Sequence, residues 1–204
     1  MFSKPYLPVK YIILYLITAP FLFGCSLFGQ SNVVNEPLSI EARNSFLSKQ
    51  DNWTLTGRIG ITSQKESNSA NISWQKRGDA IELRIYGGLG TTYALLTSSP
   101  SGSKIELSDD QVFYGNDPQE LLWRTTGWNI PVVELQKWIL GLTYGAPSFQ
   151  LNDQGLVDSI TFNSWQLSFQ KYAVFSGLDL PKKLRAEHPD VTLKFAIYNW
   201  EFAK

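Results

Sequence analysis

Apolar and polar residues alternate along most of this chain, and that alternation limits the folds it can adopt. In the first such stretch, Trp53, Leu55 and Ile59 fall on one face and polar side chains fall between them. A period of two residues is typical of a β-strand with one buried face. The pattern returns at 71–75, 81–85, 105–107, 149–151, 160–162, 165–169 and 191–197. Ten or eleven short strands joined by turns predict a strongly bent antiparallel sheet with one apolar and one polar face.

Turn residues separate several of these stretches. Asp153-Gln154-Gly155 and Asn163-Ser164 predict tight hairpin turns between consecutive strands. Three helices are predicted as well. The first spans residues 39–49 with Ser39 as N-cap, and the second begins at Asp117-Pro118 and ends at Gly127.

The third helix opens at Pro131 and carries a continuous apolar stripe. Its members have the i, i+3, i+4, i+7 spacing of one helix face, and they are Leu135, Trp138, Ile139 and Leu142. Such a stripe must cover an apolar surface, and we expect that surface to be the open side of the curved sheet.

The N-terminus predicts export. Residues 1–10 carry Lys4 and Lys10 without an acid, and the 13 residues from Tyr11 to Phe23 are almost wholly apolar, whereas a membrane-spanning helix needs about 20. Gly24 before the single cysteine, Cys25, resembles the lipobox of bacterial lipoproteins, although Phe23 departs from it. We predict a signal peptide over 1–24, Cys25 with N-acyl and S-diacylglycerol groups, a tether over 25–38 and a single domain over 39–204. An anchor without lipid, or a plain signal peptide, is the alternative.

Composition limits the partners. Removal of the leader leaves 16 basic and 18 acidic side chains in 180 residues, so overall charge predicts no binding to nucleic acid or anionic headgroups. One cysteine permits no intrachain disulfide, and the seven tryptophans indicate that packing supplies the stability.

No group of residues predicts an enzyme, a metal site or a cofactor. His188 is the only histidine, precedes Pro189-Asp190 and is interpreted as part of a solvated turn. The glycine-rich segment 87–90 lacks the lysine and the following helix of a phosphate loop.

The same segment places Leu89 between Gly88 and Gly90, which leaves it no bulky neighbour. This leucine either inserts into a bilayer or a hydrophobic client, or folds back onto the edge of the sheet. The apolar face is equally open to two interpretations, because a sheet of this size closes on a solid core or leaves a cavity.

At this point the sequence resembles the LolB family of outer-membrane lipoprotein receptors. The resemblance covers roughly residues 39–201, and its most specific element is Pro131 to Gly141. The residues that carry it also include Trp53, Arg58-Ile59-Gly60-Ile61, Trp74, Gly78-Asp79, Leu89-Gly90, Gly127, Trp165, Tyr172, Leu180-Pro181, Leu184 and Asn199-Trp200.

The resemblance implies a mainly β fold, a half-open antiparallel barrel of about eleven strands with helices over its concave face. It also implies a protein anchored on the periplasmic face of the outer membrane, which the Ser26 that follows Cys25 favours in the lipoprotein sorting code. Such a receptor accepts lipoproteins from the periplasmic carrier LolA and inserts them into the membrane. Leu89 corresponds to the loop leucine needed for insertion. Gly87-Gly88 stand where the family more often has Asn-Pro, so this loop is expected to be more flexible.

In this interpretation the partners are LolA, lipoprotein acyl chains and outer-membrane lipid, and the receptor acts as a monomer without a cofactor. The alternative is a lipoprotein that transfers nothing and serves as a hydrophobic-ligand binder or an envelope scaffold; a lipid-modifying enzyme is a third. The predicted lining of the acyl cavity is Trp53, Leu55, Ile59, Trp74, Leu83, Leu95, Leu135, Trp138, Ile139, Trp165, Leu167 and Phe195.

Overall fold

The computed structural model describes residues 39–127 and 129–203. The predicted signal peptide, Cys25 and tether lie outside the described residues. Residues 37–204 form one compact unit.

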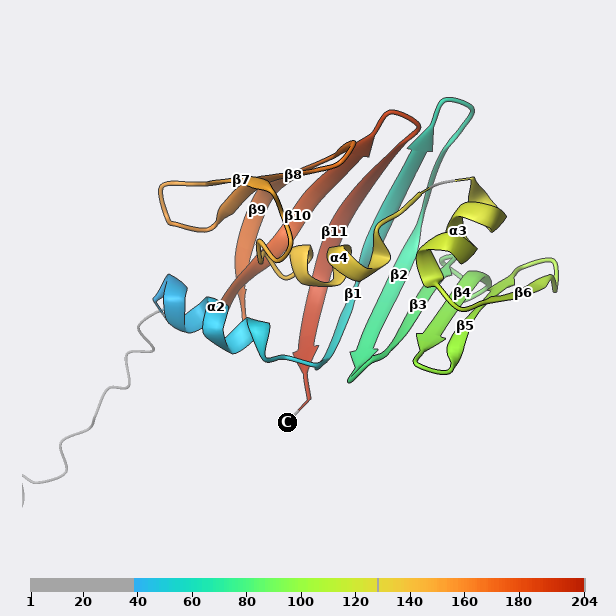
Figure 1. The fold of residues 1–204 in the computed structure, drawn as a ribbon, viewed down its shortest axis with the longest axis horizontal. Helices are drawn as coiled ribbons and strands as arrows, with labels where there is room; N and C mark the ends of the chain where they lie inside the picture. The colour runs from blue at the N-terminus through green and yellow to red at the C-terminus, as the bar shows by residue number, and fades with distance from the viewer. Residues whose placement is uncertain (1–38, 128, 204) are drawn as a thin grey trace, which may run out of the picture. The chain divides into compact units, whose positions relative to one another are not determined.

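In the described residues, eleven antiparallel strands form one sheet, as the alternation predicted, and the sheet does not close, as the resemblance implied (Figure 1). Their order is β6-β5-β4-β3-β2-β1-β11-β10-β9-β8-β7. The first strand therefore pairs with the last at the centre, and β6 and β7 are the two edges. The strands are β1 Asn52–Ser63, β2 Ser67–Arg77, β3 Ala80–Tyr86, β4 Thr92–Ser99, β5 Gly102–Leu107, β6 Val112–Gly115, β7 Ser148–Leu151, β8 Val157–Phe162, β9 Trp165–Phe175, β10 Leu178–His188 and β11 Val191–Phe202.

Three helices accompany the sheet within residues 39–127 and 129–203: α2 Ile40–Ser48, α3 Pro118–Thr126 and α4 Val132–Trp138. The predicted caps are confirmed. The Ser39 hydroxyl accepts the Ala42 N–H at 3.2 Å, and Asp117 Oδ1 accepts the Glu120 N–H at 2.8 Å. Gly127 ends α3 with φ at 78°, a left-handed conformation that glycine adopts without strain.

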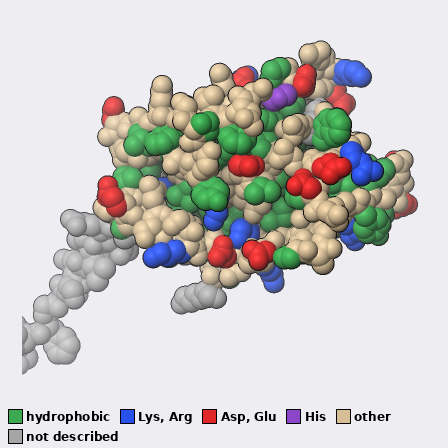
Figure 2. All heavy atoms as spheres, in the orientation of Figure 1, with side chains coloured by type: hydrophobic (Ala, Val, Ile, Leu, Met, Phe, Trp, Pro, Cys, Tyr) green, Lys and Arg blue, Asp and Glu red, His purple; other side chains and the backbone are tan. Residues whose placement is uncertain are grey.

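The helices lie on the concave face of the sheet. In Figure 1, α4 crosses in front of β11 and β1, and α3 lies over the β4–β6 side. Leu135, Trp138, Ile139 and Leu142 are buried as predicted, with exposed fractions of 7% or less. The helix itself is shorter than predicted, since α4 ends at Trp138, and Ile139 and Leu142 follow it. Apolar side chains remain visible between the elements on this face (Figure 2).

The alternation did not reveal strand β10. Pro181 interrupts its apolar positions, and the pairing with β9 shifts register on both sides of Lys183. An added residue at a bulge reverses the phase of the alternation, so the two parts of β10 do not read as one strand.

Candidate apolar cavity and its loop

A cavity of about 510 Å³ lies between the concave face and the helices. Its volume falls within the range of roughly 300–1,000 Å³ typical of ligand pockets. The lining consists of Ile59, Ile61, Asn68, Ser69, Ala70, Ile72, Trp74, Leu83, Ile85, Tyr93, Ala94, Ile105, Leu107, Ser108, Leu122, Thr126, Ile130, Val132, Leu135, Leu193 and Phe195. These residues come from β1 to β5, β11, α3, α4 and the loops beside them, so strands far apart in sequence build one apolar site.

The chemistry of the lining fits a hydrocarbon. None of the described residues that line the cavity is charged, and most are aliphatic or aromatic. An ionic ligand would lose its hydration here without a partner to replace it, whereas an alkyl chain gains about 25 cal/mol for each Å² that it buries.

Four polar members of the lining mark the mouth of the cavity. Asn68, Ser69, Tyr93 and Ser108 are exposed, and they lie where β1, β3 and β5 end and β2 and β4 begin. The deeper residues, such as Ile72 and Ile105, are buried. The cavity therefore runs from an accessible rim to an apolar interior.

The glycine-rich loop stands at this same end, between β3 and β4. Gly87 lies so close to the Tyr93 hydroxyl that an added Cβ would be 2.5 Å from it, and Tyr93 also lines the cavity. Tyr93, at the start of β4, therefore lies against the loop and also lines the mouth of the cavity.

Leu89 projects fully from the tip of this loop, with an exposed fraction of 102%. The interpretation in which it folds back onto the sheet is wrong. The base of the loop is braced: the Gly87 N–H donates to the Thr91 carbonyl at 2.8 Å, and the Gly90 N–H donates to the Gly87 carbonyl at 3.0 Å. Arg84 donates to the Gly90 carbonyl at 2.9 Å. The higher flexibility expected from Gly87-Gly88 stays a prediction. It applies to the tip of the loop, because hydrogen bonds hold the base.

The two glycines beside Leu89 differ in what they require. Gly90 has φ at 87°, so a side chain there would be strained, and a Cβ at Gly88 would meet no atom within 4 Å. Only Gly90 is therefore fixed as glycine by the backbone.

Five of the predicted lining residues contact the cavity, and they are Ile59, Trp74, Leu83, Leu135 and Phe195. The alternation missed further members from the same strands, such as Ile72 and Ile85. Both continue the buried phase of strands that the sequence had already identified, so the available signal was the alternation itself.

Six other predicted residues are buried but fill a solid core, which corrects the prediction. Their exposed fractions are 4% or less, and they are Trp53, Leu55, Trp138, Ile139, Trp165 and Leu167. The Trp53 ring packs edge-on against Trp74 and Trp200, at centroid distances of 5.8 and 5.6 Å. The Trp138 ring packs against Phe162 at 5.0 Å, and its Nε1 donates to the Tyr144 carbonyl at 2.8 Å.

The prediction for Leu95 is wrong for a different reason. Leu95 lies opposite Arg84 and Glu106 in the sheet and therefore points to the uncovered face. Leu96, with 2% of its surface exposed, takes the core position beside it. Residues 93–96 are all apolar, so their sequence does not set the phase of the alternation.

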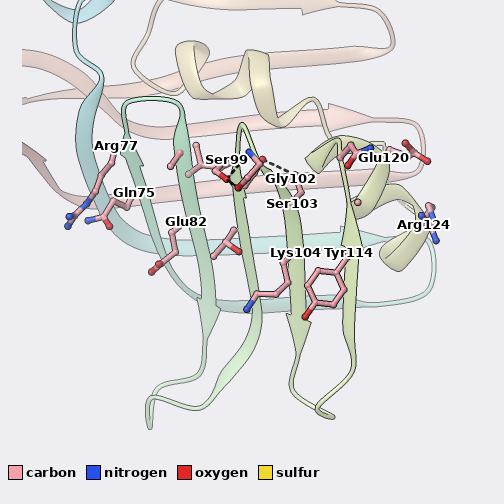
Figure 3. A pocket seen from close by; sticks show the side chains of 17 residues that line it. Gln75, Arg77, Glu82, Ser99, Gly102, Ser103, Lys104, Tyr114, Glu120 and Arg124 are labelled. Carbon is pink, nitrogen blue, oxygen red and sulfur yellow. Dashed lines mark hydrogen bonds between the residues drawn. The ribbon is translucent and has the colours of Figure 1, made fainter.

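A second hollow, of about 870 Å³, is polar (Figure 3). Its lining includes Gln75, Glu82, Lys104, Tyr114 and Arg124. This hollow is larger, but an alkyl chain bound there would remove water from its charged and hydroxyl groups. The alkyl chain offers no hydrogen bonds to replace that water. The smaller apolar cavity is therefore the better candidate for a lipid.

His188 lies at the end of a hairpin strand, as predicted, but it is not solvated. Only 18% of its side chain is exposed; its ring lies 5.2 Å from that of Trp165, and Nδ1 is 3.4 Å from Asp190 Oδ2. In the described part of the chain, no cluster of His, Cys, Asp or Glu could hold a metal ion. No helix within 39–127 or 129–203 has the length and apolarity to cross a bilayer.

Comparison with known proteins places this architecture. The family model described as "Outer membrane lipoprotein LolB" matches residues 51–200. The chain belongs to the LolB family. It is 32% identical to the outer-membrane lipoprotein LolB of Vibrio campbellii over 204 residues, which cover 96% of this chain and 99% of that protein. It is also 32% identical to LolB of Tolumonas auensis, over 74% of this chain and 78% of that protein.

The fold alone is shared with a DUF1329 family protein from Desulfovibrio piger. That crystal structure superposes with a TM-score of 0.52 over 78% of this chain and 89% of the other, at 8% identity. The LolB relatives are therefore similar to this chain in sequence, whereas the Desulfovibrio piger protein is similar to it only in fold.

Proposed function

We propose that this LolB family member is anchored through Cys25 on the periplasmic face of the outer membrane and acts there as a monomeric lipoprotein receptor. It accepts lipoproteins from the carrier LolA, holds their acyl chains in the apolar cavity and inserts them into the membrane. The observation that carries the proposal is the uncharged cavity whose mouth lies beside the projecting Leu89 loop.

Transfer through such a site runs downhill without a nucleotide. Each methylene that leaves water contributes about 0.8 kcal/mol, so a difference of a few buried methylenes sets the direction of a step. A cavity open at its mouth buries an alkyl chain less completely than a bilayer does. The client therefore passes onward into the membrane.

Leu89 has the properties of a membrane probe. Full burial of one leucine contributes roughly 1.5–3 kcal/mol, too little to anchor the protein and enough to hold the loop tip transiently in a leaflet. Because the base of the loop is braced, the tip keeps its position next to the cavity mouth, and a client that leaves the mouth meets the disturbed leaflet.

The Leu89→Glu variant tests the insertion step. A carboxylate at the tip is costly to bury, so we expect the variant to accept client from the carrier and to fail in delivering it to vesicles. Leu151→Glu is the matched control, because Leu151 is also an exposed leucine, on the edge strand β7. Normal delivery by Leu89→Glu would remove the role proposed for this loop.

The passive alternative is distinguished by the first step of the same assay. A scaffold or ligand binder that transfers nothing would leave the client on its carrier when the two proteins are mixed. Handover of the client to the wild-type protein supports a receptor.

A further inference from the structure

The uncovered, convex face of the sheet carries a concentration of positive charge. The basic residues come from four neighbouring strands, β1, β11, β10 and β9, and they are Arg58, Lys194, Lys183, Arg185 and Lys171. We refer to these five residues as the basic patch. Lys183 lies opposite Lys171, and Arg185 lies opposite Lys194. In a regular antiparallel pair such as Arg185 and Lys194 the Cβ atoms are about 4.5–5.5 Å apart, so like charges meet there. The Lys183–Lys171 pair lies at the bulge of β10, where the register shifts.

The positive charges of the patch are poorly balanced. Glu187 contacts Arg185 at 2.7 Å, but among the described residues no carboxylate lies within ion-pair distance of Lys171, Lys183 or Lys194. The Nε atom of Arg185 is buried and has no hydrogen-bond partner. Like charges placed opposite each other destabilise a sheet, so this arrangement carries a cost that an anionic partner would relieve.

Composition conceals the patch. The chain holds 18 basic and 18 acidic side chains and is neutral overall. Strand pairing places five of the basic residues in two adjacent rows across the strands, with Arg58, Lys183 and Lys171 in one row and Lys194 and Arg185 in the other.

We propose that the basic patch docks on the anionic phospholipid headgroups of a membrane surface. The cross-strand neighbours of the patch are small or polar: Asn71, Gly60, Ser168 and Ala196. Protein–protein interfaces concentrate their binding energy in buried aromatic, arginine and aliphatic anchors set in pockets. Neither hollow described above is lined by a residue of the patch, whereas attraction to a charged lipid surface needs only basic groups near it.

This docking goes beyond the proposed transfer of lipoproteins and does not depend on it. A basic surface and a lipid anchor together hold a protein on a bilayer more firmly than either one alone. The patch belongs to the central strands of the sheet, so it would fix the orientation of the whole domain against the leaflet.

Vesicle binding without any client tests the proposal. A chain that begins at Ser26 lacks the acylation site but keeps the whole compact unit 37–204. We expect it to co-sediment with vesicles of phosphatidylcholine and phosphatidylglycerol in equal parts, and not with phosphatidylcholine alone. Binding should disappear near 1 M salt, where the screening length is about 3 Å.

Charge variants locate the surface. Replacement of Lys171, Lys183 and Lys194 by Gln should weaken binding to the anionic vesicles by roughly fivefold per lysine, on the order of 100-fold together. The matched control replaces Lys49, Lys65 and Lys137, which lie at the C-cap of α2, in a loop and in α4, and it carries the same change in net charge. Circular dichroism and thermal unfolding should show that both variants fold.

Three outcomes would overturn the proposal. Equal binding to both kinds of vesicle would remove the role of headgroup charge. An equal loss in the control variant would assign binding to net charge instead of the patch. Unchanged vesicle binding together with lost handover from the carrier would assign the patch to an acidic protein. A Leu89 variant that fails in client delivery but binds vesicles normally separates this proposal from the transfer function.

Discussion

The concave face has two regions that share a sheet, a set of covering helices and an apolar composition, yet only one is hollow. In the hollow region, the residues of β1 to β5 listed above surround the 510 Å³ cavity. In the filled region, formed by β8, β9 and β10 with α2 and the end of α4, tryptophan, leucine and isoleucine side chains pack to near-complete burial. An apolar face therefore predicts burial but does not predict whether the protein or a ligand fills the space.

A buried arginine strengthens the filled region. Arg43 of α2 is 2% exposed and donates to the carbonyls of Leu140 at 2.9 Å and Asp179 at 2.5 Å. Burial lowers the pKa of its guanidinium, which is opposed by Tyr172 and Asp179. Charge-assisted hydrogen bonds of this kind join α2, the end of α4 and β10.

Truncation of a core tryptophan should produce the largest difference between the regions. Trp138→Ala in the filled region should lower the free energy of unfolding by about 3–5 kcal/mol, because it removes many contacts and leaves a void. Leu83→Ala in the hollow region should cost less than about 2 kcal/mol, because one side of Leu83 already faces the cavity. Urea unfolding measures both. Equal losses after correction for side-chain size would mean that the two regions are packed alike.

Enlargement of a small residue sharpens the comparison. Ala186→Trp in the filled region should cost at least about 1–3 kcal/mol, because Ala186 is 1% exposed and has no room to grow. Ala94→Trp should cost less, because Ala94 lines the cavity, and it should reduce the binding of a fluorescent fatty acid at least tenfold. A stable Ala94→Trp variant that still binds the probe normally would place the ligand elsewhere.

Alkaline titration reports the filled region through one tyrosine. Burial raises the pKa of Tyr172, whose hydroxyl donates to the Val157 carbonyl at 2.8 Å. A raised folded-state pKa contributes stability that is fully present below the unfolded value near 10 and is lost as the pH rises above it. The free energy of unfolding should therefore fall above pH 10, by up to about 1.4 kcal/mol per pH unit. Tyr172→Phe should be less stable at pH 8 and should lose this alkaline decline, and a decline that persists unchanged would assign it to other groups.

Much of the architecture could be predicted from local patterns. The alternation identified most strands, and the caps at Ser39 and Asp117 set two helix starts. These features depend on a few consecutive residues, whose conformational preferences act before any long-range contact forms.

The tertiary structure alone decided where the sheet is hollow, which side of it Leu95 faces and how charge is distributed. Alternation assigns a residue to one face of the sheet, but it does not give the distance between that face and the covering helices. A cavity remains where the space between sheet and helices is larger than the side chains that fill it. The basic patch arises because β1 pairs with β11, which brings Arg58 and Lys194 together across more than 130 residues of sequence. Neutral composition hides such a surface, because a sum over the chain carries no information about which strands become neighbours.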